Sequence, residues 1–385
     1  MTSIRILADD LTGALDTAAS FTGEVPVFID RPPSPGREFA DARISVVATP
    51  TRDAPSEDLP SYLQPVLQWL TSGDLAFKKV DSLLRGNTFA ELAWLAKNGN
   101  FDTTVFAPAF PAQGRVTLNG QQWVIEPGNL SGPRQPVALP FVEAFSDYDL
   151  TIGLDAQSNG KTPDVWAPDV VSNAELDAVV TMGERDETRS RLWCGSAGLA
   201  QALARRFGLA PGLMNAAAPP VVSSTGPTVL ISASHHPVFR QQWERLCCAS
   251  KPQALVKQAS PLEIENALEL VKQGASSAWI DLSPMEKLNP AQAAQKLSGQ
   301  MAQLTAGLPK PKQLIIVGGD TLLGLCRAAR VDALLAQASV RNGWGCARFL
   351  GGIWDGVPCF SRSGAFGGAD DLVEIMRLLD GNASH

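Results

Sequence analysis

The stretch Phe77-Lys78-Lys79-Val80-Asp81-Ser82-Leu83-Leu84-Arg85-Gly86-Asn87 decides the fold that we expect for this chain. The apolar run that leads into it, residues 75–77, predicts a buried strand, and the polar residues that follow predict a loop. Gly86 permits a tight backbone there, and Asn87 suits the N-terminal cap of a helix whose apolar positions fall within residues 90–96. The polar side chains would therefore stand at the carboxyl end of a strand, where open α/β sheets bind ligands.

The polar residues of this loop suit an acidic, hydroxylated ligand. Arg85 offers a planar fork for a carboxylate or phosphate, Lys79 offers a point charge, and Asp81 with Ser82 offers groups that bind hydroxyls. A charged loop between a strand and a helix is also a common solvated feature, held by its own ion pairs. The stretch alone does not decide between these two interpretations.

A pair of carboxylates follows the first expected strand, residues 4–8. Asp9 and Asp10 fall in the turn before a helix for which Thr12 is the expected cap. One carboxylate there would accept a hydroxyl proton while the other orients it or binds a metal ion indirectly. The alternative is that both merely favour the start of the helix electrostatically.

Strands and helices alternate along both halves of the chain. Further strands are expected at residues 25–29, 44–48 and 104–107, and leucines at helical spacing between Leu59 and Leu70 predict a helix. This alternation predicts a parallel, doubly wound sheet. The loop after residue 107 contains prolines that would hold it stiffly and present Gln113 and Arg115, the latter a second candidate for an acid's carboxylate or else a surface arginine.

The segment 211–227 is rich in Ala, Pro, Ser and Gly and has no sustained periodicity, so it is the expected linker. It divides the chain into an N-terminal domain, 1–210, and a C-terminal domain, 228–385. The predicted fold class is therefore α/β, with two doubly wound, mostly parallel-sheet domains and an active site in the cleft between them.

The second half restarts with a strand at residues 228–231. Ser232 and Ser234 precede a helix that Pro237 can begin, and they form a reasonable seat for an anion. His235 and His236 are interpreted as exposed side chains at the helix start. Later expected strands end before the glycine-rich positions Gly318, Gly319 and Gly364.

Composition excludes several classes of partner. The 385 residues carry a formal net charge of -7, which argues against binding nucleic acid or an anionic membrane. The six cysteines form no C-x-x-C pair, so a structural zinc site is not expected and a reducing compartment is. The sequence shows neither a signal peptide nor a run of membrane-spanning length, so we expect a cytoplasmic protein.

Four motifs occur in order along the chain: Ala8-Asp9-Asp10-Leu11-Thr12-Gly13-Ala14-Leu15-Asp16, Phe106-Ala107-Pro108-Ala109-Phe110-Pro111-Ala112-Gln113-Gly114-Arg115, Gly318-Gly319-Asp320-Thr321 and Ser363-Gly364-Ala365-Phe366-Gly367. With the stretch around Lys79, the sequence resembles the four-carbon acid sugar kinase family from about residue 4 to about residue 376. The resemblance implies ATP-dependent phosphorylation of a tetronate or oxo-tetronate. It also implies that the N-terminal domain binds the acid sugar and the C-terminal domain the nucleotide.

Individual roles follow from this resemblance. Asp10 is the expected general base, supported by Asp9. Asp320 is the expected ligand of Mg²⁺, although the family commonly has Glu there, and Ala233 stands where the family more often has Gly. The substrate residues would be Lys79, Asp81, Ser82, Arg85, Asn87, Gln113 and Arg115, and the ATP residues would be Ser232, Ser234, Gly318, Gly319, Asp320, Thr321 and Gly364.

Two other functions stay open on the sequence. A nicotinamide-dependent hydroxy-acid dehydrogenase would use the same kind of fold, but it would want G-x-G-x-x-G after a strand, and none occurs. A metabolite-binding sensor without turnover is the other, and the acidic pair speaks mildly against it. The sequence also allows a homo-oligomer.

Overall fold

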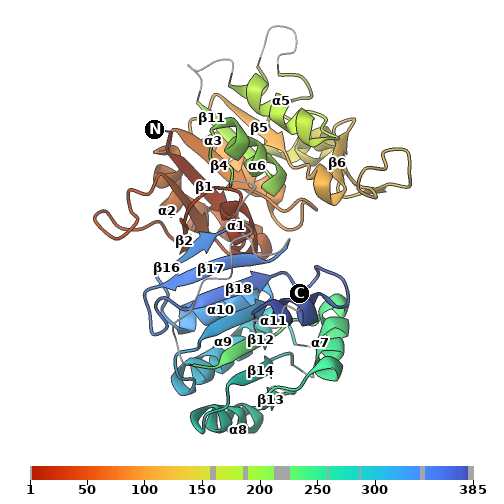
Figure 1. Ribbon diagram of the computed structural model, residues 1–385. Coiled ribbons are helices and arrows are strands. Elements are labelled where there is room, and N and C mark those ends of the chain that lie inside the picture. The colour runs from red at the N-terminus through yellow and green to blue at the C-terminus, as the bar shows by residue number, and fades with distance from the viewer. Residues whose placement is uncertain are drawn as a thin grey trace. The chain divides into compact units, whose positions relative to one another are not determined.

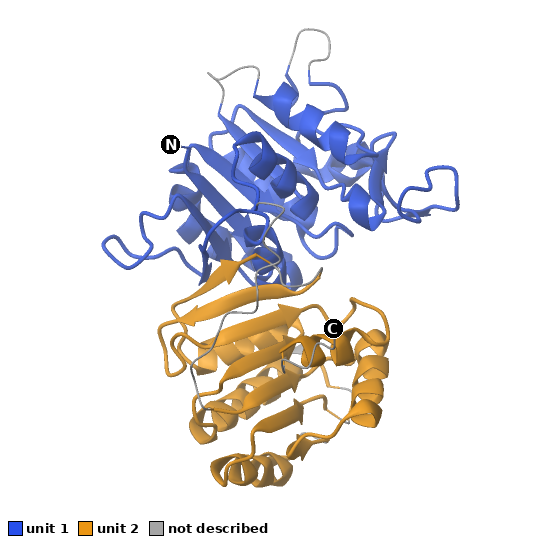
Figure 2. Cartoon of the chain, in the orientation of Figure 1, with its two compact units in different colours: residues 1–212 blue, residues 213–385 orange. Residues whose placement is uncertain are grey.

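The computed structural model describes residues 2–156, 162–184, 190–211, 226–257, 260–284, 286, 288–338 and 343–379. The chain divides into two compact units, residues 1–212 and 213–385, which Figure 2 shows in two colours. Most of the expected linker, 211–227, lies outside the described residues.

The first unit is built on a parallel sheet with the strand order β2-β3-β1-β4-β11-β5-β10-β9 (Figure 1). Its strands are short and largely buried, as their continuous apolar runs predict. Their bounds are β1 (Ile4–Ala8), β2 (Val25–Ile29), β3 (Ile44–Ala48), β4 (Leu75–Lys79), β5 (Thr103–Ala107), β9 (Ile152–Gly153), β10 (Val165–Trp166) and β11 (Arg191–Gly195).

Helices connect these strands. In α2, Leu59, Leu63, Val66 and Leu70 are all buried, as their spacing predicts. The helices are α1 (Leu11–Ala18), α2 (Leu59–Thr71), α3 (Thr88–Asn98), α4 (Phe141–Ala144), α5 (Asn173–Gly183) and α6 (Ala197–Arg206); a small sheet contains β6 (Arg115–Leu118), β7 (Gln121–Val124) and β8 (Gln135–Pro136).

One expected helix cap is wrong. The cap of α1 is Asp10, whose side chain accepts a hydrogen bond from the Gly13 amide, and not Thr12. An aspartate two residues earlier competes for the same free amides, and its backbone is extended, as a cap requires.

The second unit has the strand order β13-β14-β12-β15-β18-β17-β16. The five strands from β13 to β18 in this order are parallel, whereas β17 runs antiparallel to both of its neighbours, a pairing that the sequence did not predict. The strands are β12 (Thr228–Ser232), β13 (Ala254–Val256), β14 (Ser277–Asp281), β15 (Gln313–Val317), β16 (Ala333–Gln337), β17 (Gly345–Leu350) and β18 (Pro358–Arg362).

The helices of this unit pack large aromatic side chains against the sheet. Trp243 of α7, Trp279 of β14 and Phe360 of β18 belong to one buried cluster. The helices are α7 (Pro237–Ala249), α8 (Pro261–Lys272), α9 (Pro290–Gly307), α10 (Gly319–Ala328) and α11 (Asp371–Leu379). The predicted fold class, two mostly parallel α/β domains, is confirmed.

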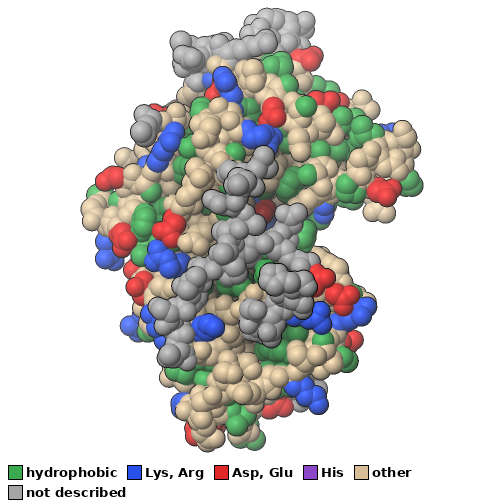
Figure 3. Space-filling view, viewed as in Figure 1, with side chains coloured by type: hydrophobic (Ala, Val, Ile, Leu, Met, Phe, Trp, Pro, Cys, Tyr) green, Lys and Arg blue, Asp and Glu red, His purple; other side chains and the backbone are tan. Residues whose placement is uncertain are grey.

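Two structural properties bear on the partners that the composition argues against, nucleic acid and membranes. On the face drawn in Figure 3, acidic and basic side chains of the described residues are interspersed, and no large area carries one sign of charge. Within the described parts of the chain, no helix is both long and apolar enough to cross a membrane.

Candidate active site

Parallel register brings five strand ends of the first unit to one level. Ala8 is paired with Ala48 of β3 and with Lys79 of β4, Lys79 is paired with Gly195, and Gly195 is paired with Ala107. The loops that follow these strands therefore leave the sheet at the same edge. This edge carries the residues that the motifs singled out.

Asp9 and Asp10 share one guanidinium at this edge. Arg52 donates from Nε and Nη2 to the two carboxylate oxygens of Asp9, at 3.0 and 2.8 Å. The same Nη2 lies 2.7 Å from Oδ1 of Asp10. Asp9 is buried, whereas the side chain of Asp10 is 21% exposed. Asp10 is thus the carboxylate of the pair that solvent reaches.

The two carboxylates differ in acidity for a physical reason. Burial acts to raise the pKa of Asp9, but the charges of Arg52, Lys78 and Lys79 outweigh it and hold that pKa below its ordinary value. Burial raises the pKa of Asp10, and the neighbouring charge of Asp9 adds to this, against the attraction of Arg52. Asp10 is therefore the more basic of the two.

Lys79 reaches the start of α1 from β4. Its Nζ donates to the Val80 carbonyl at 2.9 Å, and the side chain is almost fully buried. A Cβ at Gly13 would overlap Oδ1 of Asp10 and lie 3.0 Å from Nζ of Lys79. The glycine of the first motif therefore lets an ammonium approach the helix start and its capping carboxylate.

Arg85, Asp81 and Arg115 form a second cluster at the same edge. Nε of Arg85 donates to Oδ2 of Asp81, and Nη1 of Arg115 donates to the Gln113 carbonyl. Burial acts to raise the pKa of Asp81, but the Arg85 hydrogen bond and the charge of Arg52 hold it below its usual range. Ser82 contributes its carbonyl, which accepts from the Gln122 side chain at 3.1 Å.

Asn87 occupies the cap position of α3, but the expected side-chain cap is wrong. Its amide nitrogen donates instead to the carbonyls of Thr51 and Ala54, at 2.8 and 2.7 Å, and its oxygen accepts from Ser56 at 3.0 Å. The side chain therefore fastens the loop that contains Arg52 and has little left to offer a hydroxyl.

Sequence reasoning missed Arg52. It lies in the short 3-10 turn Thr51–Asp53, four residues after the end of β3. The rule that selected Asp9, a polar residue shortly after a buried strand, could also have found Arg52. Arg52 follows β3, and β3 is paired with β1, the strand that precedes Asp9.

In the second unit, the predicted nucleotide residues also gather at one edge. Ser232 is paired in register with Asp281 and Val317, and Val317 is paired with Arg362. Ser232 is itself fully buried; its hydroxyl donates to the Val317 carbonyl at 2.8 Å and accepts from the Ser234 amide at 3.1 Å. Its hydroxyl thus shapes the loop and does not face solvent.

Gly318 and Thr321 begin α10 directly after β15. Gly318 has a φ of 115°, which favours glycine, and no side chain caps the helix. Oγ1 of Thr321 accepts from the Ala233 amide at 3.1 Å, which ties the loop after β12 to this helix start. Gly319 and Asp320 occupy the first turn, and Asp320 is exposed.

Gly364 lies against Ser234, because a Cβ there would overlap the serine hydroxyl. The loop that contains it is held from inside by Arg362, a fully buried guanidinium that sequence reasoning did not place in the core. Arg362 donates to the Phe366 carbonyl and Asp371 from Nη1 and to Gln242 from Nη2.

Asp281 and Arg240 are a further ion pair at this edge that the sequence did not single out. Arg240 Nη1 lies 2.7 Å from Oδ2 of Asp281, and Ser283 donates to Oδ1 at 2.6 Å. Ser283 also lies 3.2 Å from the Ser234 carbonyl. His235 and His236 are exposed, as expected, and Nδ1 of His236 accepts from the Val238 amide at the start of α7.

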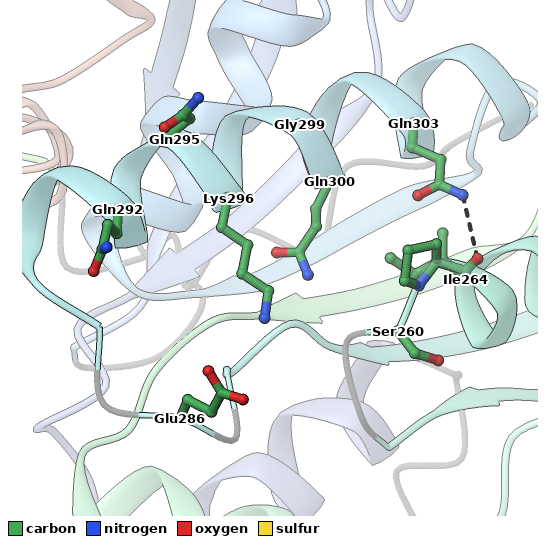
Figure 4. A pocket seen from close by; sticks show the side chains of 10 residues that line it. Ser260, Ile264, Glu286, Gln292, Gln295, Lys296, Gly299, Gln300 and Gln303 are labelled. Carbon is green, nitrogen blue, oxygen red and sulfur yellow. Dashed lines mark hydrogen bonds between the residues drawn. The ribbon is translucent and has the colours of Figure 1, made fainter.

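A separate pocket of about 640 Å³ opens between the start of α8 and one side of α9, from Gln292 to Gln303. Figure 4 shows Lys296 and Gln300 extending from α9 toward the side on which Glu286 and Ser260 lie. Gln303 donates to the Pro261 carbonyl at its rim, at 3.3 Å. None of the predicted site residues lines this pocket, and we assign it no part in the chemistry below.

Comparisons with known proteins identify the family of this chain. The family model for a sugar-binding N-terminal domain matches residues 4–159, and that for a nucleotide-binding C-terminal domain matches residues 229–372. The chain belongs to the four-carbon acid sugar kinase family. The predicted family and the predicted enzyme class, a sugar-acid kinase, are confirmed.

Curated members of the family resemble the chain over nearly its full length. A D-threonate kinase of Salmonella typhimurium is 21% identical over 97% of this chain and 98% of its own. A 3-oxo-tetronate kinase of Cupriavidus necator is 26% identical over 98% of this chain and 97% of its own. The solved structure of a Haemophilus influenzae protein of the DUF1537 family, 19% identical, has the same fold, with a TM-score of 0.71 over 97% of this chain and 100% of that one.

Proposed function

We propose that this chain is an ATP-dependent kinase that phosphorylates the terminal hydroxyl of a four-carbon sugar acid, D-threonate, D-erythronate or 3-oxo-tetronate. The observation that carries the proposal is the solvent-reachable carboxylate of Asp10, held between Arg52 and the start of α1 at the edge of the sugar-binding domain. A carboxylate in such surroundings can accept a hydroxyl proton, and the cations beside it can hold an acid.

The charges at this edge suit an anion. Among the described residues, four cations, Arg52, Lys79, Arg85 and Arg115, neighbour four carboxylates, Asp9, Asp10, Asp16 and Asp81. These charges balance one another, so the carboxylate of a sugar acid would bind where an arginine is exposed. Arg85 is the best placed to bind it, since its side chain is 53% exposed and its planar fork keeps free donors.

Asp10 is the proposed general base, and Asp9 supports it. Both oxygens of Asp9 accept from Arg52, whereas only Oδ1 of Asp10 accepts hydrogen bonds from the part of the chain that the structure describes. Oδ2 of Asp10 is then available to a substrate hydroxyl. In kinases this proton transfer accompanies attack on the γ-phosphorus, and the carboxylate also orients the nucleophile.

The second unit suits the nucleotide. The first turn of α10, which follows Gly318, has no side-chain cap, so its backbone amides can bind a phosphate. The loop with Ser234 is tied to this turn through Ala233 and Thr321, and Gly364 lies against Ser234. Asp320 in that turn would repel a phosphate unless a cation lay between them, which favours Mg²⁺ at Asp320. When bound, ATP with Mg²⁺ would supply the phosphoryl group and neutralise its charge.

A coupled assay on a panel of tetronates tests the proposal and its alternatives. ADP formation with one or more of the three acids supports a kinase, and the preferred acid identifies the stereochemistry. NADH formation or consumption without ADP would favour the dehydrogenase. Binding of a tetronate with neither reaction would favour the sensor.

The assignment of ligands to units needs its own experiment. Photo-crosslinking with azido-ATP should label peptides after residue 226, and excess unlabelled ATP should prevent it. Labels confined to peptides before residue 210 would reverse the assignment. Excess tetronate without ATP is the matched control, because it should leave the labelling in place.

A further inference from the structure

The two consecutive lysines of the central stretch do different things. Successive side chains of a strand point to opposite faces of the sheet, so Lys79 reaches α1 while Lys78 reaches α3 on the other face. Lys78 meets Glu91 of α3, with 2.7 Å between Nζ and Oε2. Both side chains are fully buried, at 0% exposure. Neither of them has a direct part in the proposed chemistry, although the charge of Lys78 helps to lower the pKa of Asp9.

The buried pair is connected to the turn that contains Arg52. Oγ1 of Thr51 donates to the same oxygen of Glu91 at 2.8 Å, and Thr49 Oγ1 lies 3.0 Å from Thr51 Oγ1. Thr51 is fully buried and is the first residue of the turn Thr51–Asp53. The position of Glu91 therefore fixes the residue next to Arg52.

Other contacts also hold this turn in place. The Arg52 amide donates to the Asp9 carbonyl at 3.2 Å. Asn87 bonds to the Thr51 carbonyl, and a Cβ at Gly86 would overlap the Arg52 carbonyl. Of these anchors, the Lys78 and Glu91 pair is the one that consists of charges.

A buried ion pair is a costly way to fill a core. Apolar side chains of similar volume in its place are often neutral or stabilising, whereas removing one partner alone is strongly destabilising. Stability therefore does not explain this pair well. A need to hold one geometry does.

We propose that Lys78 and Glu91 are a positioning pair for the kinase reaction: through Thr51 they fix the turn that aligns Arg52 with Asp9 and Asp10, without touching the substrate. The inference rests on the proposed function, because it assigns the pair a part in that reaction.

Thr51 offers the sharpest test, because its hydroxyl can be removed without changing its shape. Thr51→Val breaks the link to Glu91 and leaves the ion pair in place, and Thr51→Ser restores the hydroxyl. We expect Thr51→Val to lower kcat/KM for the acid about 10-fold, as for one hydrogen bond to a charged group, with KM for ATP unchanged. The kcat/KM of Thr51→Ser for the acid should stay within about 2-fold of wild type, a much smaller change than the loss of one such hydrogen bond would cause.

The double variant Lys78→Met with Glu91→Met separates positioning from stability. We expect Glu91→Gln alone to lower both Tm and kcat/KM, and the double variant to regain Tm but not kcat/KM. Leu92→Ala is the matched control, since it removes a neighbouring buried side chain of α3 that does not contact the turn through a hydrogen bond. It should lower Tm and leave KM for the acid unchanged.

Two results would overturn the inference while the proposed function stands. One is wild-type kcat/KM in Thr51→Val, and the other is recovery of kcat/KM together with Tm in the double variant. If wild-type protein phosphorylates no tetronate, the proposed function fails first. Binding of the acid, measured by calorimetry on Thr51→Val and Thr51→Ser, then still tests whether the turn is held for ligand binding: weaker binding by Thr51→Val supports it, and equal binding refutes it.

Discussion

Nη2 of Arg52 lies 2.7 Å from Oδ1 of Asp10 and 2.8 Å from Oδ1 of Asp9, so one guanidinium holds two carboxylates that are neighbours in sequence. The arrangement makes the pair asymmetric, because both oxygens of Asp9 accept from Arg52, whereas the partly exposed Asp10 accepts from the described residues through Oδ1 alone. The first two predictions follow from this asymmetry.

Asp10→Asn keeps the shape of the side chain and loses the base. We expect kcat to fall by about 10² to 10⁴ while KM for ATP stays nearly constant. Steady-state kinetics with ATP and the preferred tetronate measure both. Asp9→Asn is the comparison: if it loses kcat and Asp10→Asn does not, the two roles are exchanged, and if both variants stay active, neither carboxylate is the base.

The acidic limb of the pH profile should report Asp10. A base must be ionised, so kcat/KM should fall as the pH falls through the pKa of Asp10, which burial and the Asp9 charge raise above its ordinary value against Arg52. Arg52 and Lys79 both act to lower the pKa of Asp10. Because Arg52→Met removes one of these charges, it should raise this pKa and move the acidic limb to higher pH. A limb that stays in place in Arg52→Met would assign it to another group.

Arg85→Ala should weaken binding of the acid by about 1.5 to 3 kcal/mol, the range for a hydrogen bond to a charged group. Arg85→Lys should also be impaired, because a point charge does not replace a bidentate fork. KM for the acid, measured at saturating ATP, is the readout. Arg205→Ala is the control, since Arg205 forms an exposed pair with Asp177. Unchanged KM and kcat in Arg85→Ala would remove Arg85 from the site.

Arg362→Met should affect the nucleotide and not the acid. It leaves Asp371 without its guanidinium partner in the core and releases the Phe366 carbonyl, so the loop with Gly364 loses its internal support. We expect the free energy of unfolding to fall by about 3–5 kcal/mol and KM for ATP to rise. Denaturant titration and kinetics measure these.

The exposed Arg377 of α11 provides the control for that variant. Arg377→Met should change neither quantity, because an exposed arginine on this helix supports no loop. A rise in KM for the acid in Arg362→Met, equal to that for ATP, would show a general loss of structure and not a loss at the nucleotide loop.

The local patterns of the sequence determined the elements of this protein. Apolar runs such as residues 4–8 and 44–48 became strands with the expected bounds, and a polar residue after a strand became a residue of the sheet's carboxyl edge. The reason is physical: a buried strand, or the apolar face of a helix, is determined by residues that lie only a few positions apart in the sequence. The position of Asp9, Asp10, Lys79 and Arg85 at this edge was therefore predictable from the chain alone.

The tertiary structure decided which of these residues meet. Arg52 and Asp9 are 43 positions apart and come together only because β1 and β3 are paired in register. Alternation along β4 sends Lys78 and Lys79 to opposite faces, and the packing of α3 then gives Lys78 its buried partner Glu91. Asn87 and Arg362, charged or polar in sequence, turned inward to hold loops whose backbones need partners. Such contacts depend on the register and the packing of distant elements, which no short window of sequence contains.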